Sequence, residues 1–98
     1  SQSAWYGSIN TAVKIGGGTS PAADTRRIIL IRLCQEIDGA ERYTTLQEAR
    51  SYEAGTELQV VIPNIKGAAG IGKGTVEIVD ASNDTVIASY TVNFAPRS

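Results

Sequence analysis

The chain has 98 residues, of which 42% are hydrophobic and 19% are charged, a balance typical of a folded globular domain rather than a disordered segment. A formal net charge of −1 argues against nucleic acid as the principal partner, because binding to phosphates requires a surplus of Lys and Arg. The absence of histidine removes the commonest general base and the commonest metal ligand. We therefore expect a non-catalytic protein that needs no cofactor and no metal.

The apolar composition favours strands, because eleven Ile and seven Val stand against four Leu, and nine Thr add further β-branched side chains. Residues 5–15 place apolar side chains such as Trp5 and Ile9 at odd positions and mostly polar or small ones at even positions, which predicts a half-buried strand. Residues 16–24 are rich in Gly, Pro and small side chains and predict a flexible loop. Residues 1–15 are thus expected to form an N-terminal strand or arm, which either packs in its own domain or reaches a neighbouring subunit.

Residues 26–37 are apolar on both faces at first and alternate towards the end, which predicts a central strand. Asp38 and Gly39 follow, and these residue types suit a tight type I′ hairpin turn. A return strand over residues 40–46 is therefore expected.

The segment after this hairpin carries a helix-start signal. In residues 45–50, Thr45 can act as the N-cap and Glu48 stands three positions later, as in a capping box. This signal competes with a continued strand. We expect a short helix or an irregular crossover that ends before Gly55.

Three further strands are predicted in the second half of the chain. Residues 56–62 alternate in polarity and are followed by Pro63, which is expected to end that strand. Residues 75–80 and 85–94 flank four short polar residues that suit a turn, so they are expected to form a last hairpin. The apolar side chains expected to share one face of its second strand are Val86, Ala88, Tyr90, Val92 and Phe94.

Six or seven short strands with at most one short helix predict an all-β fold. The leading arrangement is an immunoglobulin-like antiparallel β-sandwich with Greek-key connections, although the paired cysteines of antibody domains are absent. No internal repeat or heptad pattern is present, so residues 1–98 are expected to form a single domain. The lone Cys34 cannot form an internal disulfide and lies in an apolar segment, so we expect a buried thiol rather than a reactive one.

The sharpest local motif is the stretch GAAGIGKGT at residues 67–75. It resembles the phosphate-binding loop of adenylate kinases, in which glycine amides cradle phosphates and a lysine reaches the terminal ones. The resemblance implies a strand before the loop, a helix after it and a bound nucleotide. Residues 75–79 alternate like a strand instead, and Gly74 stands where the generic motif has Ser or Thr, so we expect a glycine loop between two strands.

Two other groups of polar residues have ordinary explanations. Residues 80–84 could supply oxygens to a calcium ion, but they lack the spacing and the later Glu of a dedicated loop, so turn chemistry is expected. Arg26, Arg27 and Arg32 could bind a carboxylate-bearing partner, but charges that flank a strand are the expected reading.

No apolar run is long enough for a membrane helix, so no membrane span is expected. The sequence contains no Met, which indicates removal of either an initiator or a leader. The use of cysteine leaves both the cytosol and the exterior open, and we favour a virion or extracytoplasmic location.

Two functions from different classes follow. The small size, the lack of catalytic groups and the N-terminal arm favour a structural subunit that self-assembles or decorates a larger assembly through strand edges and the arm, such as a virion coat, decoration or fibre protein. The alternative is a monomeric extracytoplasmic protein-binding or inhibitor module that uses its glycine-rich loops. The interface residues expected in the arm and in the loop of residues 67–75 are Trp5, Tyr6, Ile9, Gly70, Gly72 and Lys73.

Overall fold

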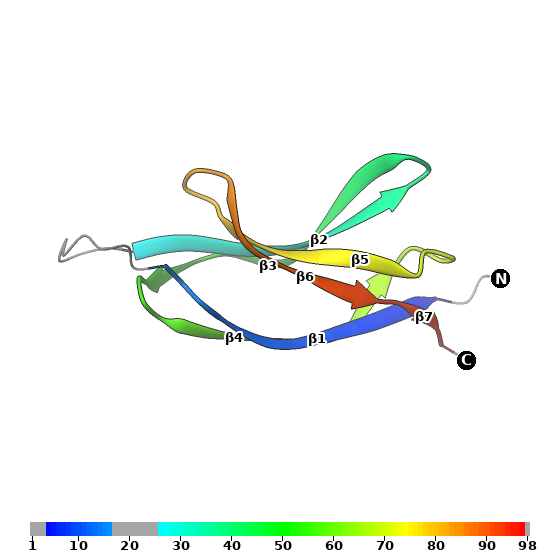
Figure 1. Ribbon diagram of the computed structural model, residues 1–98, viewed down its shortest axis with the longest axis horizontal. Helices are drawn as coiled ribbons and strands as arrows, with labels where there is room; N and C mark the ends of the chain where they lie inside the picture. The colour runs from blue at the N-terminus through cyan, green and yellow to red at the C-terminus, as the bar shows by residue number, and fades with distance from the viewer. Residues whose placement is uncertain (1–3, 17–25, 98) are drawn as a thin grey trace.

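The computed structural model describes residues 4–16 and 26–97. Within these residues the chain forms strands and no helix, so none of them spans a membrane as a helix (Figure 1). Most of the flexible loop predicted at residues 16–24 lies outside the described residues. The strands are β1 (Trp5–Lys14), β2 (Arg26–Ile37), β3 (Ala40–Glu53), β4 (Glu57–Gly67), β5 (Lys73–Asp80), β6 (Thr85–Asn93) and β7 (Ala95–Pro96).

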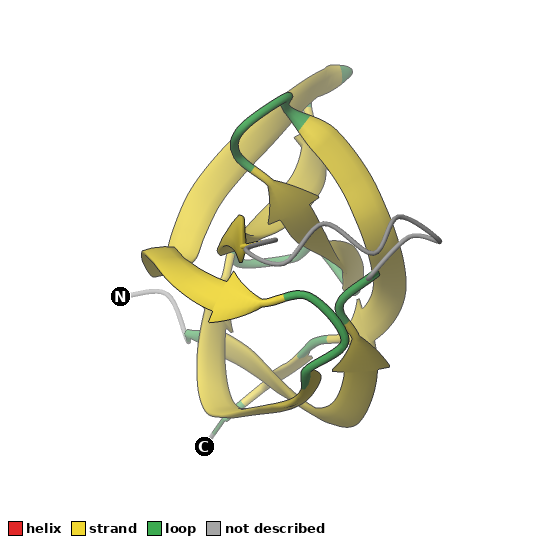
Figure 2. Ribbon diagram, turned by 90° about the vertical axis from the view of Figure 1, so that its left-hand side faces the viewer, coloured by secondary structure: helices red, strands yellow, loops and turns green. Residues whose placement is uncertain are grey.

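The strands form two antiparallel sheets that pack face to face as a β-sandwich (Figure 2). The larger sheet has the order β3-β2-β5-β6, and the smaller sheet has the order β4-β1-β7. Strands β2 and β5 are central, which agrees with the nearly continuous apolar sequence of β2. The prediction of an all-β sandwich is therefore confirmed at the level of two packed antiparallel sheets.

The N-terminal strand is a central strand of the smaller sheet. It pairs with β4 of its own chain from Trp5 opposite Gly67 to Lys14 opposite Glu57. Ile9 and Val13 point into the space between the sheets, as the alternation in residues 5–15 predicted. In this structure the segment belongs to the core of its own chain.

The hairpin between β2 and β3 is confirmed. Asp38 has φ 53° and Gly39 has φ 80°, and a type I′ turn requires positive φ at both central positions. Ile37 lies opposite Ala40 across this turn.

The helix or crossover expected at residues 45–50 is wrong, because β3 runs without a break from Ala40 to Glu53. Its pairing with β2 is irregular in this segment, with two register shifts around Ile31 of β2. Each shift puts an extra residue on β3, as in a β-bulge. Pairing with a buried central strand thus outweighs the local capping-box preference at Thr45, and the irregularity is absorbed by bulges.

The expected strand end at Pro63 is also wrong, because β4 continues to Gly67. Strand β4 lies at the edge of its sheet, where a proline removes no ladder hydrogen bond on the outer side. A register shift opposite Gly7 and Ile9 accommodates the extra residue, and Asn64 takes φ 56° there. The proline therefore marks a bulge in an edge strand.

The predicted last hairpin is confirmed as β5 and β6, and β5 begins at Lys73, two residues earlier than expected. The register between them shifts between Ile78 and Val79, so that β6 carries Ile87 as an extra residue.

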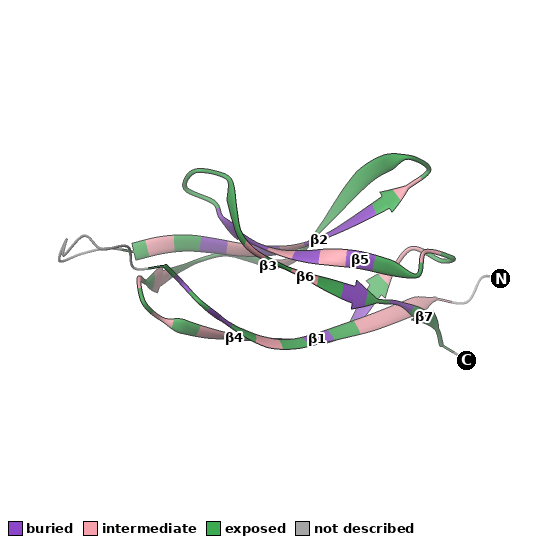
Figure 3. Cartoon of the chain, in the orientation of Figure 1, coloured by how far each residue is buried: buried purple, intermediate pink, exposed green. Residues whose placement is uncertain are grey.

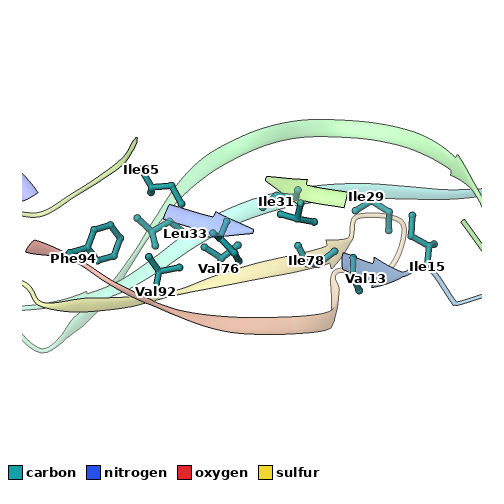
Figure 4. Close-up of a cluster of buried hydrophobic side chains, with 12 residues drawn as sticks. Val13, Ile15, Ile29, Ile31, Leu33, Ile65, Val76, Ile78, Val92 and Phe94 are labelled. Carbon is teal, nitrogen blue, oxygen red and sulfur yellow. The ribbon is translucent and has the colours of Figure 1, made fainter. Parts of the chain in front are cut away.

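The core fills the space between the two sheets (Figures 3 and 4). Its fully buried members are mostly β-branched. Cys34, on the other face of β2, is also buried, at 9% exposure, as expected. The members of this core with the least exposure include Ile15, Ile29, Ile31, Leu33, Val60, Val76 and Ile78.

Candidate assembly interface

One side of the sandwich is bordered by strand edges that have no pairing strand among the described residues. Strand β7 covers the second edge of β1 only at Trp5 and Tyr6, which lie opposite Pro96 and Ala95. The rest of that edge, residues 7–14, is unpaired on the side away from β4. Strand β6 pairs with β5 alone, so its other edge is unpaired as well.

These two edges lie on the same side of the molecule. The chain passes from β6 directly into β7, which pairs with the start of β1 (Figure 1). At this end the backbone of β1 at Gly7 approaches that of β6 at Asn93 closely. A Cβ placed on Gly7 would lie 2.5 Å from the carbonyl oxygen of Asn93. The sheets are therefore joined near Asn93, and the edge of β6 is open further towards Thr85.

Strand β6 differs in composition from the other long edge strands. Its sequence, TVIASYTVN, contains no charged residue, no Pro and no Gly. In contrast, β3 carries five charged residues and β4 carries two together with Pro63. Charges, prolines and bulges on an edge oppose pairing with another chain, so β6 is the least protected of the three.

Within β6, the regular part lies between the bulge at Ile87 and the close approach at Asn93, and it spans residues 88–92. Ala88 and Tyr90 are half-buried and pack against the core on the inner face. Ser89 and Thr91 are exposed on the outer face. A strand added to this edge would meet apolar side chains on one face and hydroxyl groups on the other.

An apolar cluster on the outer face of the larger sheet adjoins β6. Leu30 of β2 pairs with Val79 of β5, which pairs with Val86 of β6, so the three side chains are neighbours on this face. Val79 is fully buried, whereas Val86 is 41% exposed and Ile28, two residues before Leu30, is 37% exposed. Of these residues, Val86 is the one that is both exposed and on the open-edge strand β6.

The expected interface residues of the N-terminal strand lie mainly against the core of their own chain. Ile9 is a buried core residue, and Trp5 is half-buried and packs against the same core. Tyr6 is half-buried, and the guanidinium of Arg97 lies 4.0 Å from the centre of its ring. Arg97 also donates a hydrogen bond to the side chain of Asn64, which fixes the C-terminal segment next to β1.

The loop between β4 and β5 is held in one conformation by hydrogen bonds. The N–H of Ile71 donates to the carbonyl of Ala68 at 3.1 Å, and Gly70 has φ 84°, as a type II turn requires at its third position. The buried side chain of Gln35 accepts a hydrogen bond from the N–H of Ala68 at 3.0 Å. Its amide nitrogen also lies 3.4 Å from the carbonyl oxygen of Lys73.

The structure brings the three expected loop residues together. Gly70, Gly72 and Lys73 line one shallow depression, which Glu36 and Ile71 complete. The same loop follows Gly67, which pairs with Trp5, so the depression lies at the end where β1 begins.

The loop does not have the surroundings that the resemblance to adenylate kinases implies, because strand β5 follows it in place of a helix. Two of its amide groups, those of Ala68 and Ile71, are already used within the chain. The orientation of free amides towards a phosphate at a helix N-terminus is therefore missing here.

The arginines expected to flank a strand are each occupied by contacts within the chain. Arg32 forms an ion pair with Glu77 at 2.8 Å, and this hydrogen bond raises the pKa of its guanidinium. Arg26 donates to the Ser51 hydroxyl, and Arg27 donates to the carbonyl of Gly16.

Asp80 shows the expected turn chemistry, because its carboxylate accepts a hydrogen bond from the N–H of Ser82 at 3.0 Å. No cluster of three or more metal-ligating side chains occurs in residues 4–16 and 26–97.

A small polar cluster lies on the outer face of the larger sheet, where the second half of β2 pairs with β3. The guanidinium of Arg32 lies 4.5 Å from the ring centre of Tyr43, and the Tyr43 hydroxyl donates to Glu41 at 3.0 Å. This hydrogen bond raises the pKa of Tyr43 to about 12. Burial raises the pKa of the neighbouring Cys34 thiol, so the thiolate form is disfavoured.

Over residues 4–16 and 26–97 the protein is a small antiparallel β-sandwich in which the uncharged strand β6 has one edge without a pairing strand. A scan against protein-family models and searches of curated proteins and of solved structures found no match to this chain.

The open edge of β6 was not among the expected interface residues. The signal for it was present in the sequence, since residues 85–93 lack charge and are β-prone. The position of this strand at an edge depends on the sheet order, which the sequence pattern did not reveal.

Proposed function

We propose that the protein is a non-catalytic structural subunit that assembles with copies of itself or onto a larger assembly, in the manner of virion coat, decoration or fibre proteins. The observation that carries this proposal is the uncharged open edge of β6, together with the unpaired edge of β1 at residues 7–14. An unprotected edge presents a row of backbone donors and acceptors that an extended strand can satisfy. A monomeric protein ordinarily blunts such an edge with charge or proline.

The proposal places the contacts on strand edges rather than on a free N-terminal arm. Residues 5–14 already form the central strand of the smaller sheet, so they cannot leave it as an arm that completes a neighbour's sheet, whereas the edge of residues 7–14 that faces away from β4 can still accept a strand. Deletion of residues 1–15 would remove core residues such as Ile9 and Ile15, and it would test folding rather than assembly.

We also propose that the topology is an immunoglobulin-like Greek key. The order β3-β2-β5-β6 joins two hairpins through a central pair, as strands C′, C, F and G do in variable-type domains. The pairing of β1 with β4 corresponds to that of strands B and E. An experimental structure that shows a different strand order would contradict this assignment.

The function is tested by measuring molar mass in solution by light scattering over a wide range of protein concentration. The unmodified chain is expected to form oligomers as concentration rises. Ser89→Lys, which places a charge in the middle of the open edge, is expected to shift the chain towards monomer. Gln59→Lys, at an exposed position of the other edge strand β4, is the matched control and should assemble normally.

A chain that stays monomeric at every concentration would overturn self-assembly, which is the part of the proposal that this experiment tests. Equal changes of assembly in Ser89→Lys and Gln59→Lys would also count against the proposal, because the effect would then come from the net charge and not from the edge of β6. Circular dichroism establishes that both variants fold.

The alternative function, a monomeric protein-binding or inhibitor module, is favoured by the fixed loop whose depression contains Gly70, Gly72 and Lys73. Gly72 is the position at which to probe it, because a Cβ there meets nothing within 4 Å. Gly70 is less suitable, since its φ of 84° makes any side chain strained by about 1–2 kcal/mol. A stable monomer would leave this alternative as the favoured function.

A further inference from the structure

We infer that two copies of this chain pair edge to edge through β6, antiparallel, about a two-fold axis at Tyr90. This inference rests on the proposed function and specifies the partner and the register of the contact. It joins the two larger sheets into one continuous sheet with the order β3-β2-β5-β6 followed by β6-β5-β2-β3 of the second copy.

The segment available for pairing determines the position of the axis. The bulge at Ile87 disturbs the edge on one side, and the approach of Gly7 to Asn93 covers it on the other. Residues 88–92 remain, and Tyr90 is their centre. A two-fold axis through this centre uses the whole regular segment in both copies.

The side chains suit this register on both faces. Tyr90 lies opposite its own equivalent, and Ala88 lies opposite Val92, all on the inner face next to the core. The half-buried Ala88 and Tyr90 would therefore lose further exposure to water. On the outer face Ser89 lies opposite Thr91, and such hydroxyl pairs are favourable cross-strand neighbours.

The two-fold symmetry explains why two copies pair through their β6 edges and not through the edges of β3 or β4. In a two-fold antiparallel pair, each residue faces a residue of the same segment, so a charged strand is prone to place like charges near one another. Strand β3 contains five charged residues and two register shifts, and β4 contains Pro63 at its bulge. Strand β6 contains neither a charge nor a proline.

A contact over five residues is small, below the roughly 1,200 Å² at which stable interfaces begin, so the pairing should be weak unless further contacts of an assembly add to it. The dimer is therefore expected to depend on concentration. The exposed apolar side chain of Val86 lies on β6 itself, next to the paired segment.

Disulfide cross-linking tests the register. In a Cys34→Ser background, the double variant Ser89→Cys with Thr91→Cys places each new cysteine opposite its counterpart in the second copy. We expect covalent dimers on mild oxidation at high protein concentration. Either single variant should cross-link poorly, because identical residues then lie diagonally at about 7–8 Å, beyond the ordinary span of a disulfide.

The matched control is Gln59→Cys with Val61→Cys, two exposed positions with the same spacing on the edge strand β4. It should give few dimers. A second measurement needs no substitution: amide hydrogen exchange of residues 88–92 in the unmodified chain should slow as the protein concentration rises, while that of residues 57–62 should not.

The outcomes separate this inference from the proposed function. If the unmodified chain forms oligomers but neither cross-linking nor slower exchange occurs at β6, the inference is overturned while the proposed function stands. If Ser89→Cys alone cross-links as well as the double variant, the axis lies at Ser89 and the register is overturned. If the chain is monomeric throughout, both fail.

Discussion

The ring of Phe94 lies directly against the α-carbon of Gly67, so that a Cβ at residue 67 would lie 2.8 Å from the ring. Phe94 is 5% exposed and connects β6 to β7, where the chain crosses from the larger sheet to the smaller one. The contact fixes the end of β4 against this crossover, which closes one end of the sandwich. The absence of a side chain at Gly67 is therefore required by packing, since its φ is not in the left-handed region.

Gly67→Ala is accordingly expected to destabilise the fold by about 1–3 kcal/mol, the usual cost of an extra methyl group in a packed core. The free energy of unfolding in urea measures this. Gly72→Ala is the control, because a Cβ there has open space and the change should cost little. Equal stability of the two variants would show that Phe94 can move aside without cost.

Gln35→Leu should loosen the loop between β4 and β5. The substitution removes the acceptor for the partly buried N–H of Ala68, and because water can reach this group in part, the cost should lie towards the lower end of the roughly 1–3 kcal/mol of a fully buried unsatisfied donor. We expect lower stability in denaturant and faster amide exchange at residues 68–72, with little change in β3. Unchanged exchange in this loop would mean that the turn from Ala68 to Ile71 holds without Gln35.

Tyr43 should make stability depend on pH in the alkaline range. Its hydrogen bond to Glu41 raises its pKa from 10 to about 12, so the folded state favours the neutral phenol. A group with a raised folded-state pKa contributes stability that is present below pH 10 and is lost as the pH rises from 10 to 12.

Titration of phenolate absorbance measures this behaviour. One tyrosine of the unmodified chain should ionise near pH 12, and this late step should be absent from Tyr43→Phe. In Glu41→Gln the same tyrosine should ionise closer to pH 10, because the carboxylate that holds the proton is gone. A titration of Glu41→Gln identical to that of the unmodified chain would contradict the assignment.

The Cys34 thiol should react slowly with a thiol reagent in the folded chain. It is 9% exposed, and burial raises its pKa, so both access and the thiolate fraction are low. Tyr43→Ala is expected to speed the reaction, because Tyr43 is its cross-strand neighbour on β3. A native rate equal to that of the urea-unfolded chain would contradict this prediction.

Local patterns in the sequence were sufficient for most of the strands. The alternation in residues 5–15, the continuous apolar run of residues 26–37 and the Asp38-Gly39 turn each depend on neighbours in the chain, and each is present in the structure. The two wrong expectations, a helix signal at Thr45 and a strand end at Pro63, concern places where a bulge changes the register. A bulge depends on the partner strand, so neighbouring residues alone did not indicate it.

The candidate site was harder to predict than the fold. The sequence directed attention to Trp5 and Ile9; in the structure Ile9 lies in the core of its own chain and the half-buried Trp5 packs against it. It passed over β6, whose lack of charge has consequences only at the edge of a sheet.

The sequence by itself determined that this protein is all-β, that Cys34 is buried and where most of the turns lie, because these properties follow from side-chain period, β-branching and the φ preferences of Gly and Asp. Only the tertiary structure decided which strands are central and which are edges. That order depends on pairings between residues distant in the chain, such as Leu30 with Val79 and Trp5 with Gly67. The open edge of β6, and with it the proposed contact between two copies, exists only once those pairings are made.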